Sequence, residues 1–173
     1  MDALLEILKI VLPSGIVFAT SYFLVKNFLN SEHEKRLSEA RLANQQTITP
    51  IRLQAYERII LFLERISPNS LIARVYKNGM SSRQLQAELL KTIRAEFEHN
   101  LSQQIYMSNK TWEMVKGAKE ENIKLINLAS TKVLDNASGL DLSQTIIQMN
   151  SQLVKSPTQT AIENIKSEIE ERF

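Results

Sequence analysis

The sequence predicts an all-α protein, and three observations lead to that prediction. Glycine and proline are scarce, with 4 of each in 173 residues, and strong helix formers such as Leu, Glu, Lys and Ala are frequent. Apolar residues recur at spacings of three and four, and no segment alternates with a period of two. We expect an N-terminal transmembrane helix with a solvated stalk, followed by a compact bundle of about five to six helices.

Residues 1–29 are predicted to form the membrane anchor. Residues 10–25 carry no charge and lie between Lys9 and Lys26. A helix of that length reaches about 24 Å, against about 30 Å for the hydrocarbon core of a bilayer, and snorkelling of both lysines extends the reach. The apolar residues expected to contact lipid are Ile10, Val11, Leu12, Ile16, Val17, Phe18, Tyr22, Phe23, Leu24 and Val25.

Three other interpretations of this segment stay open. A cleaved signal peptide would use residues 19–21 as its small-residue site, although Asp2 and Glu6 stand where a basic region is usual. A run below about 20 residues also fits a buried helix of a soluble protein. Pro13 could instead divide an interfacial helix from a shorter spanning helix.

Residues 30–49 are expected to be a helical stalk, and residues 50–173 a cytoplasmic bundle. Thr49 would cap a new helix with Pro50 in its first turn, and this helix would stop at Ser67-Pro68. A short helix would then end near Asn78-Gly79. Later helices are expected to begin at Ser81 and at Ser156, which form capping boxes with Gln84 and Gln159. Two others are expected to begin at Ser108 and Ser138.

Two helices have informative apolar patterns. One carries a stripe spaced by four residues, which winds about 200° around the helix and must meet different neighbours at its two ends; its members are Leu85, Leu89, Ile93, Phe97, Leu101 and Ile105. The last helix has a narrow seam of about 80°, made by Ile162, Ile165, Ile169 and Phe173. That seam predicts a helix on the outside of the bundle, or one that pairs with a second copy.

Residues for catalysis are few. The chain has no Cys and 2 His, and its glycines are scattered, which leaves little for a catalytic triad or a phosphate loop. Glu96 and His99 have the Glu-x-x-His spacing of di-iron bundles, but a second copy of that motif is missing. A solvated helix face is the favoured interpretation, and a metal-binding or di-iron-like enzyme is the alternative. No cofactor is expected.

Arginines gather in residues 50–80. Arg52, Arg58 and Arg65 offer a second alternative, a membrane-proximal binder of anionic lipid or nucleic acid. The favoured interpretation is ordinary packing beside Glu57 and Glu64, without a nucleic-acid partner.

The stretch YERIILFLERI, residues 56–66, has an apolar arc of about 180°, wider than a surface helix needs. Leu61 is the exception, because it falls on the charged face. We therefore take Leu61, with Arg58 and Arg65, as a candidate interaction surface. A second candidate is the end of the last helix at Ile165, Ile169 and Phe173.

Three further stretches carry a family resemblance: RLQAYER at 52–58, LERISPN at 63–69 and EFEHNLSQQ at 96–104. With the N-terminal span, they resemble a bacterial family of small, single-pass membrane-anchored proteins of unknown function. The resemblance implies the architecture and brings no activity or catalytic residue.

The expected function is a membrane-anchored protein-interaction module without catalysis, an anchor, adaptor or accessory subunit. Its partners would be membrane lipid and a protein or a second copy, with no small-molecule substrate. More basic residues follow the span than precede it, since Lys26, Lys35 and Arg36 follow and Lys9 alone precedes. This bias places the N-terminus outside and the C-terminal domain in the cytoplasm, at the bacterial inner membrane.

Overall fold

The computed structural model describes residues 2–172, with side chains described from Gly15 onward except at position 19. Every regular secondary-structure element in this range is a helix, so the all-α prediction is confirmed. The chain divides into two compact units, one ending at Thr49 and one beginning at Pro50. The second unit is a helical bundle.

The first helix, α1, runs without interruption over Asp2–Ile66. The prediction that Thr49 and Pro50 start a new helix is therefore wrong, and the backbone is also helical at Pro13. An interior proline removes one backbone hydrogen bond and costs about 3 kcal/mol. The helix nevertheless continues through both prolines. The predicted stop at Ser67-Pro68 is confirmed, since α1 ends at Ile66.

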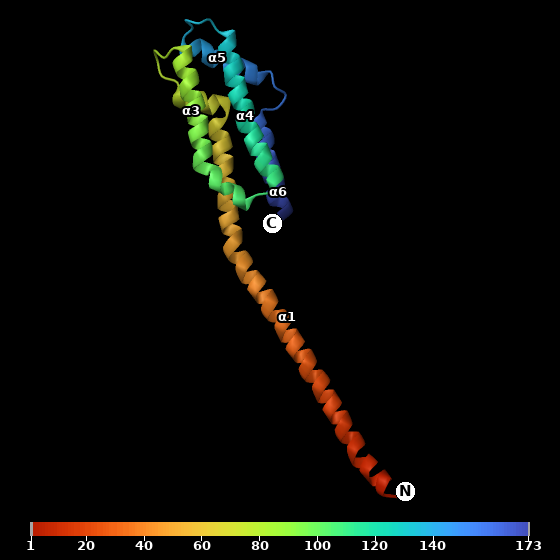
Figure 1. Ribbon diagram of the computed structural model, residues 1–173. Helices are drawn as coiled ribbons and strands as arrows, with labels where there is room; N and C mark the ends of the chain where they lie inside the picture. The colour runs from red at the N-terminus through yellow and green to blue at the C-terminus, as the bar shows by residue number, and fades with distance from the viewer. Residues whose placement is uncertain (1, 173) are drawn as a thin grey trace. The chain divides into compact units, whose positions relative to one another are not determined.

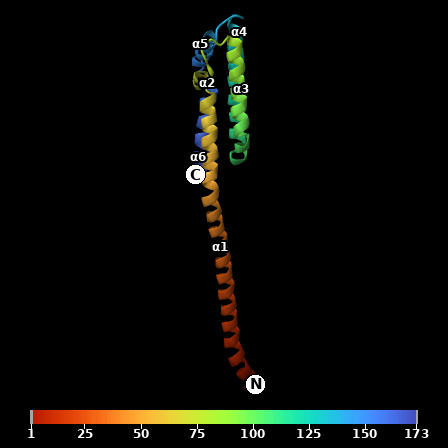
Figure 2. The same cartoon turned by 90° about the vertical axis from the view of Figure 1, so that its left-hand side faces the viewer.

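The remaining helices of the bundle are shorter. They are α2 (Pro68–Val75), α3 (Ser82–Asn100), the 3₁₀ helix η1 (Leu101–Tyr106), α4 (Asn109–Lys132), α5 (Gly139–Ser151) and α6 (Pro157–Arg172). Helix α4 packs against α3, α5 and α6, and α3 also contacts α2 and α5. Figures 1 and 2 show these helices gathered around the C-terminal end of α1.

The core of the bundle contains apolar side chains from all six α-helices. The stretch 56–66 contributes Tyr56, Ile59, Phe62, Leu63 and Ile66, all almost fully buried. An aromatic cluster extends this core, because Phe97 lies 5.9 Å from Phe62 and 5.5 Å from Trp112 between ring centroids. The wide apolar arc therefore faces the protein's own interior.

The predicted helix starts are mostly confirmed. Ser81 and Gln84 form the expected capping box, and the Ser108 hydroxyl accepts a hydrogen bond from the Thr111 N–H. A further capping box joins Ser138 and Asp141. At Ser156 the hydroxyl accepts from the Gln159 N–H at 3.2 Å.

The winding stripe on α3 was expected to meet different neighbours at its two ends, but its C-terminal end leaves the core instead. Leu85, Leu89 and Ile93 are fully buried, whereas Leu101 and Ile105 are exposed. The α-helix ends at Asn100, and the tighter η1 helix follows. The stripe therefore leaves the core at the point where the helix type changes.

Candidate functional site

One surface brings several of the predicted residues together and is centred on Glu96, near the C-terminal end of α3. Arg65, at the end of α1, places its Nη1 3.4 Å from both Glu96 carboxylate oxygens. Arg74, on α2, places its Nη1 3.1 Å from Glu96 Oε1, and its Nη2 donates to the Arg65 carbonyl at 3.0 Å. One half-buried carboxylate thus holds arginines from two other helices.

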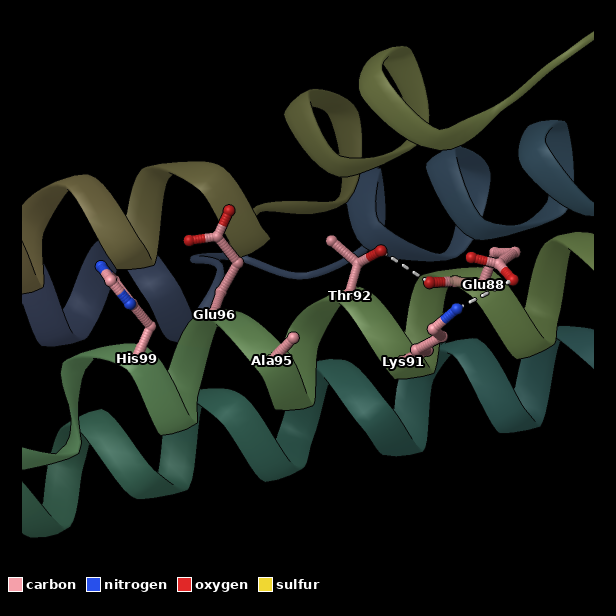
Figure 3. Close-up of a pocket in the computed structure, with 6 residues that line it drawn as sticks. All are labelled: Glu88, Lys91, Thr92, Ala95, Glu96 and His99. Atoms are coloured by element: carbon pink, nitrogen blue, oxygen red, sulfur yellow. Dashed lines mark hydrogen bonds and ion pairs between the residues drawn. The ribbon is translucent and has the colours of Figure 1, made fainter.

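His99 lies one turn beyond Glu96 on the same face of α3. Its Nε2 is 3.3 Å from Arg58 Nη2. A guanidinium has no acceptor, so Arg58 is the donor and Nε2 accepts. Figure 3 shows Glu96 and His99 projecting from α3 in line with Ala95, Thr92 and Lys91. With Glu88, these side chains line a shallow cavity of about 310 Å³.

These contacts define the chemistry available at the Glu-x-x-His motif. The Glu96 carboxylate and His99 Nε2, the atoms that a metal would need, are both engaged by arginines. Within the part of the chain that the structure describes, no group of three or more His, Asp or Glu side chains is placed to hold a metal ion. The site is built for ion pairing and hydrogen bonding.

Leu61 lies on the surface beside this charged cluster. Its side chain is 60% exposed, and it shares one face of α1 with Arg58 and Arg65, three and four residues away. Arg52, the remaining arginine of the predicted set, lies near Tyr56 and outside the Glu96 cluster. We call Arg58, Leu61, Arg65, Arg74, Glu96 and His99 the Glu96 surface.

The described side chains of the second predicted surface, on the last helix, are mostly buried. Ile165 is fully buried and Ile169 is half-buried, because α6 packs its apolar seam against the core beside α4. Phe173 lies outside the described residues. Among the described residues of this seam, Ile169 is the one with a partly exposed side chain near the end of α6.

The N-terminal part of α1 holds the predicted anchor. More than half of the surface of each described anchor residue is exposed. These residues are Ile16, Val17, Phe18, Tyr22, Phe23, Leu24 and Val25. The side chains of Ile10, Val11 and Leu12 lie outside the described residues. In the described part of the chain, no helix has the length and apolarity needed to cross a membrane.

One polar cluster was missed by the sequence analysis. Glu168 on α6 is buried, and its Oε1 accepts from the Tyr56 hydroxyl and the Ser108 N–H, each at 2.8 Å. Its Oε2 accepts from the Ser108 hydroxyl at 2.8 Å, and Arg172 Nη2 lies 2.9 Å from Oε1. The available signal was a glutamate three residues after Ile165, beside an apolar seam.

Titration in this cluster follows from burial and hydrogen bonding. Burial alone would raise the pKa of Glu168, but Thr111, Ser108 and Tyr56 stabilise the carboxylate and hold its pKa below the usual 4.5. Burial, together with the Glu168 carboxylate, raises the pKa of Tyr56 to about 12. The pair is therefore a carboxylate and a neutral phenol at neutral pH, which suits a structural contact.

Comparison with known proteins assigns the chain to a family. No curated protein matches the chain, and no solved structure matches it either. A family model described as "Family of unknown function (DUF7935)" matches residues 2–172, across both units of the chain. The protein is therefore a member of the DUF7935 family of unknown function.

Proposed function

We propose that this chain is a membrane-anchored helical protein-interaction module, which acts as an anchor, adaptor or accessory subunit of a membrane complex. The observation that carries the proposal is the apolar surface near the start of α1. Nine large apolar side chains between Ile16 and Leu29 have exposed fractions from 56% to 75%. A contiguous apolar surface of this kind calls for cover by lipid or by another protein.

Lipid is the cover proposed here, because the uncharged run begins at Ile10 and is bracketed by Lys9 and Lys26. The basic residues that follow it support a cytoplasmic bundle at a bacterial inner membrane. The chain has no Cys, so a single cysteine introduced at the exposed Glu98 can report the topology. A membrane-impermeant maleimide should label Glu98→Cys only after the cells are broken.

Fractionation of cell membranes tests the anchor. Changing Val17 and Leu24 to Asp should move the full chain from the membrane to the soluble fraction, since each central charge costs about 3 kcal/mol in a bilayer. The matched control changes Leu37 and Leu42, which are exposed but lie beyond the apolar run, and it should remain in the membrane. A wild-type chain that stays soluble without detergent would contradict the proposal.

The Glu96 surface is the proposed contact with the protein partner. It presents an exposed leucine between arginines. Arginine is one of the residue types that often dominate the binding energy at interfaces. Affinity capture of the detergent-solubilised chain should recover a partner that is lost with Leu61→Asp. The control, Leu140→Asp, changes another exposed leucine on α5 and should retain it. Equal recovery by both variants would exclude this surface.

A further inference from the structure

Four charged side chains surround Leu61 on the exposed face of α1. They come from a Glu-Arg pair that occurs twice, one heptad apart, as Glu57-Arg58 and Glu64-Arg65. At 3.6 residues per turn, both glutamates lie about 40° to 60° to one side of Leu61, and both arginines lie about 40° to 60° to the other side. The face therefore has an apolar centre, an acidic flank and a basic flank. We call these five residues the Leu61 face.

The charges of the Leu61 face do not neutralise one another within α1. Opposite charges pair along a helix at separations of three or four residues, whereas each glutamate here is one, six or eight positions from an arginine. In the described part of the chain, no ion pair involves Glu57, Glu64 or Arg58. The two carboxylates are therefore open to cations from outside the chain.

The two arginines also keep binding capacity. Arg58 contacts His99 through Nη2, and Arg65 contacts Glu96 through Nη1. Each guanidinium carries five N–H donors, and the Arg65 side chain is still 57% exposed. Both can accept a carboxylate from a partner without giving up their contacts to α3.

A second copy of the same face offers the matching charges. When two identical helices run parallel about a two-fold axis, each flank faces the opposite flank of the partner helix. With Leu61 against its counterpart on the axis, Glu57 lies within about 1.5 Å, along the helix, of the level of the partner's Arg58. Glu64 lies equally close to the level of the partner's Arg65. Each copy thus places its acidic flank against the basic flank of the other.

The same charges disfavour an antiparallel pair. Antiparallel helices about a two-fold axis bring like flanks together, so glutamates would face glutamates and arginines would face arginines. Flanking charges of this kind set the orientation of paired helices. The pattern on α1 is therefore complementary to itself in the parallel orientation only.

We propose that the Leu61 face is a self-association surface, on which a second copy of this chain docks with its α1 parallel. Leu61 meets its counterpart on the axis, and the glutamates and arginines of the two copies pair across it. The inference rests on the proposed role as an interaction module, and it names the partner of the Glu96 surface, to which Arg58, Leu61 and Arg65 belong.

This contact is small, because it covers about three turns of one helix. Exposed ion pairs stabilise only weakly, so the contact alone gives a weak dimer in dilute solution. Anchoring of both copies in one membrane, as proposed above, would raise their effective concentration. The dimer is therefore to be measured in membranes.

Disulfide crosslinking in isolated membranes tests the arrangement, because the chain has no Cys of its own. Oxidation should join Leu61→Cys chains into a covalent dimer. Gln54→Cys, exposed and one heptad before Leu61, should crosslink as well, since parallel helices keep equal positions side by side. Leu140→Cys, on the exposed side of α5, is the control and should stay monomeric.

Two crosslinking results would overturn the proposal. One is a Leu61→Cys chain that stays monomeric or crosslinks no better than Leu140→Cys. The other is a Gln54→Cys chain that stays monomeric while Leu61→Cys crosslinks, because the two helices would then not be parallel.

An exchange of charges tests the pairing across the axis. In the Leu61→Cys chain, the double change Glu57→Arg and Glu64→Arg makes both flanks basic, and Arg58→Glu with Arg65→Glu makes both acidic. Each variant alone should form about tenfold less crosslinked dimer, since like charges then face each other. Co-expression of the two variants should restore a mixed dimer. If the mixture does not crosslink although each variant keeps the circular dichroism spectrum of the wild type, the assigned pairing is wrong.

Affinity capture separates this inference from the proposed function. A tagged wild-type chain in detergent should recover an untagged second copy, and Leu61→Asp should lose it. Recovery of a different protein through Leu61, without a second copy, would keep the interaction module and reject self-association. If nothing that the chain captures depends on Leu61, both proposals for this surface fail.

Discussion

Glu168 connects three segments of the bundle through one buried carboxylate. Its oxygens accept from Tyr56 on α1 and from Ser108 at the start of α4, and Arg172 adds an ion pair within α6. Removing a carboxylate from water is costly unless charge and hydrogen-bonding capacity are both compensated. Here several donors converge on it, which explains why a charged residue is tolerated beside Ile165.

We predict that Glu168 makes the bundle sensitive to acid. Its folded pKa is held below the ordinary value of 4.5, so the stabilisation is present above that value and is lost as the pH falls through the folded pKa. Glu168→Gln should cost about 2 kcal/mol at neutral pH, because charged hydrogen bonds are lost. When urea unfolding is measured at a series of pH values, the free energy of unfolding of the variant should fall less steeply toward acid pH than that of the wild type. Parallel curves for the two proteins would contradict this role.

Through Tyr56, the free energy of unfolding should decrease at alkaline pH, the opposite of the effect of Glu168. The folded pKa is raised to about 12 from 10.0, so this contribution to stability is complete below pH 10.0 and is lost as the pH rises toward 12. The loss should approach about 3 kcal/mol, at 1.36 kcal/mol for each unit of pKa difference. Tyr56→Phe should remove this decline and cost about 1 kcal/mol at neutral pH. A variant that declines as steeply as the wild type between pH 10.0 and 12 would exclude Tyr56 as its source.

At the scale of elements, α3 and α5 begin at two capping boxes that are joined by backbone pairing. The Ser82 N–H donates to the Ala137 carbonyl at 3.0 Å, and the Gly139 N–H donates to the Met80 carbonyl at 2.7 Å. A Cβ at position 139 would lie 3.0 Å from the Met80 carbonyl oxygen and 3.3 Å from the Tyr76 ring. The close approach of the two helix starts therefore favours glycine at position 139.

Gly139→Ala should destabilise the bundle by about 1 to 3 kcal/mol, the usual range for overpacking. Gly117 gives a matched control: it lies inside α4, and a Cβ there would meet nothing within 4 Å. Gly117→Ala should stabilise by up to about 1 kcal/mol, through helix propensity. Thermal unfolding followed by circular dichroism measures both. If the two substitutions shift the midpoint in the same direction, the packing argument at Gly139 is wrong.

The helix starts show what could be predicted from local patterns. Ser81 and Ser108 were recognised because capping acts over three residues. The Thr49-Pro50 pattern predicts a helix start that the structure does not have, because α1 continues through both residues. The box at Ser138 was overlooked because Asp141 stands where Glu or Gln is usual.

The candidate sites depend on contacts between distant parts of the chain. Arg65 and Arg74 meet Glu96 across 31 and 22 positions of sequence, and Tyr56 meets Glu168 across 112. No periodicity encodes such pairs. The exposure of Leu61, by contrast, follows directly from its angle on the helix. The sequence therefore predicts faces of helices well and pairings between them poorly.

At the scale of the whole molecule, the chain consists of two units with different requirements. The bundle has its own core, which begins at Ala55, five residues after the unit boundary at Pro50. Every described side chain from Gly15 to Ile48, except Glu32, is exposed. Stability of the bundle should therefore arise within residues 50–173, whatever covers the N-terminal segment.

Two deletions test this separation. Removing residues 1–49 should change the free energy of unfolding of the bundle by less than about 0.5 kcal/mol, the usual range for changes outside a core. Removing residues 1–60 takes away Tyr56 and Ile59, both almost fully buried, and should cost at least about 5 kcal/mol, comparable to the total stability of a small domain. Trp112, the single tryptophan, lies in the core against Phe97, so its fluorescence during urea unfolding reports the bundle alone. A large loss of stability on removal of residues 1–49 would show that the bundle depends on the N-terminal segment. An unfolding midpoint unchanged by removal of residues 1–60 would show that the end of α1 is not part of the bundle's core.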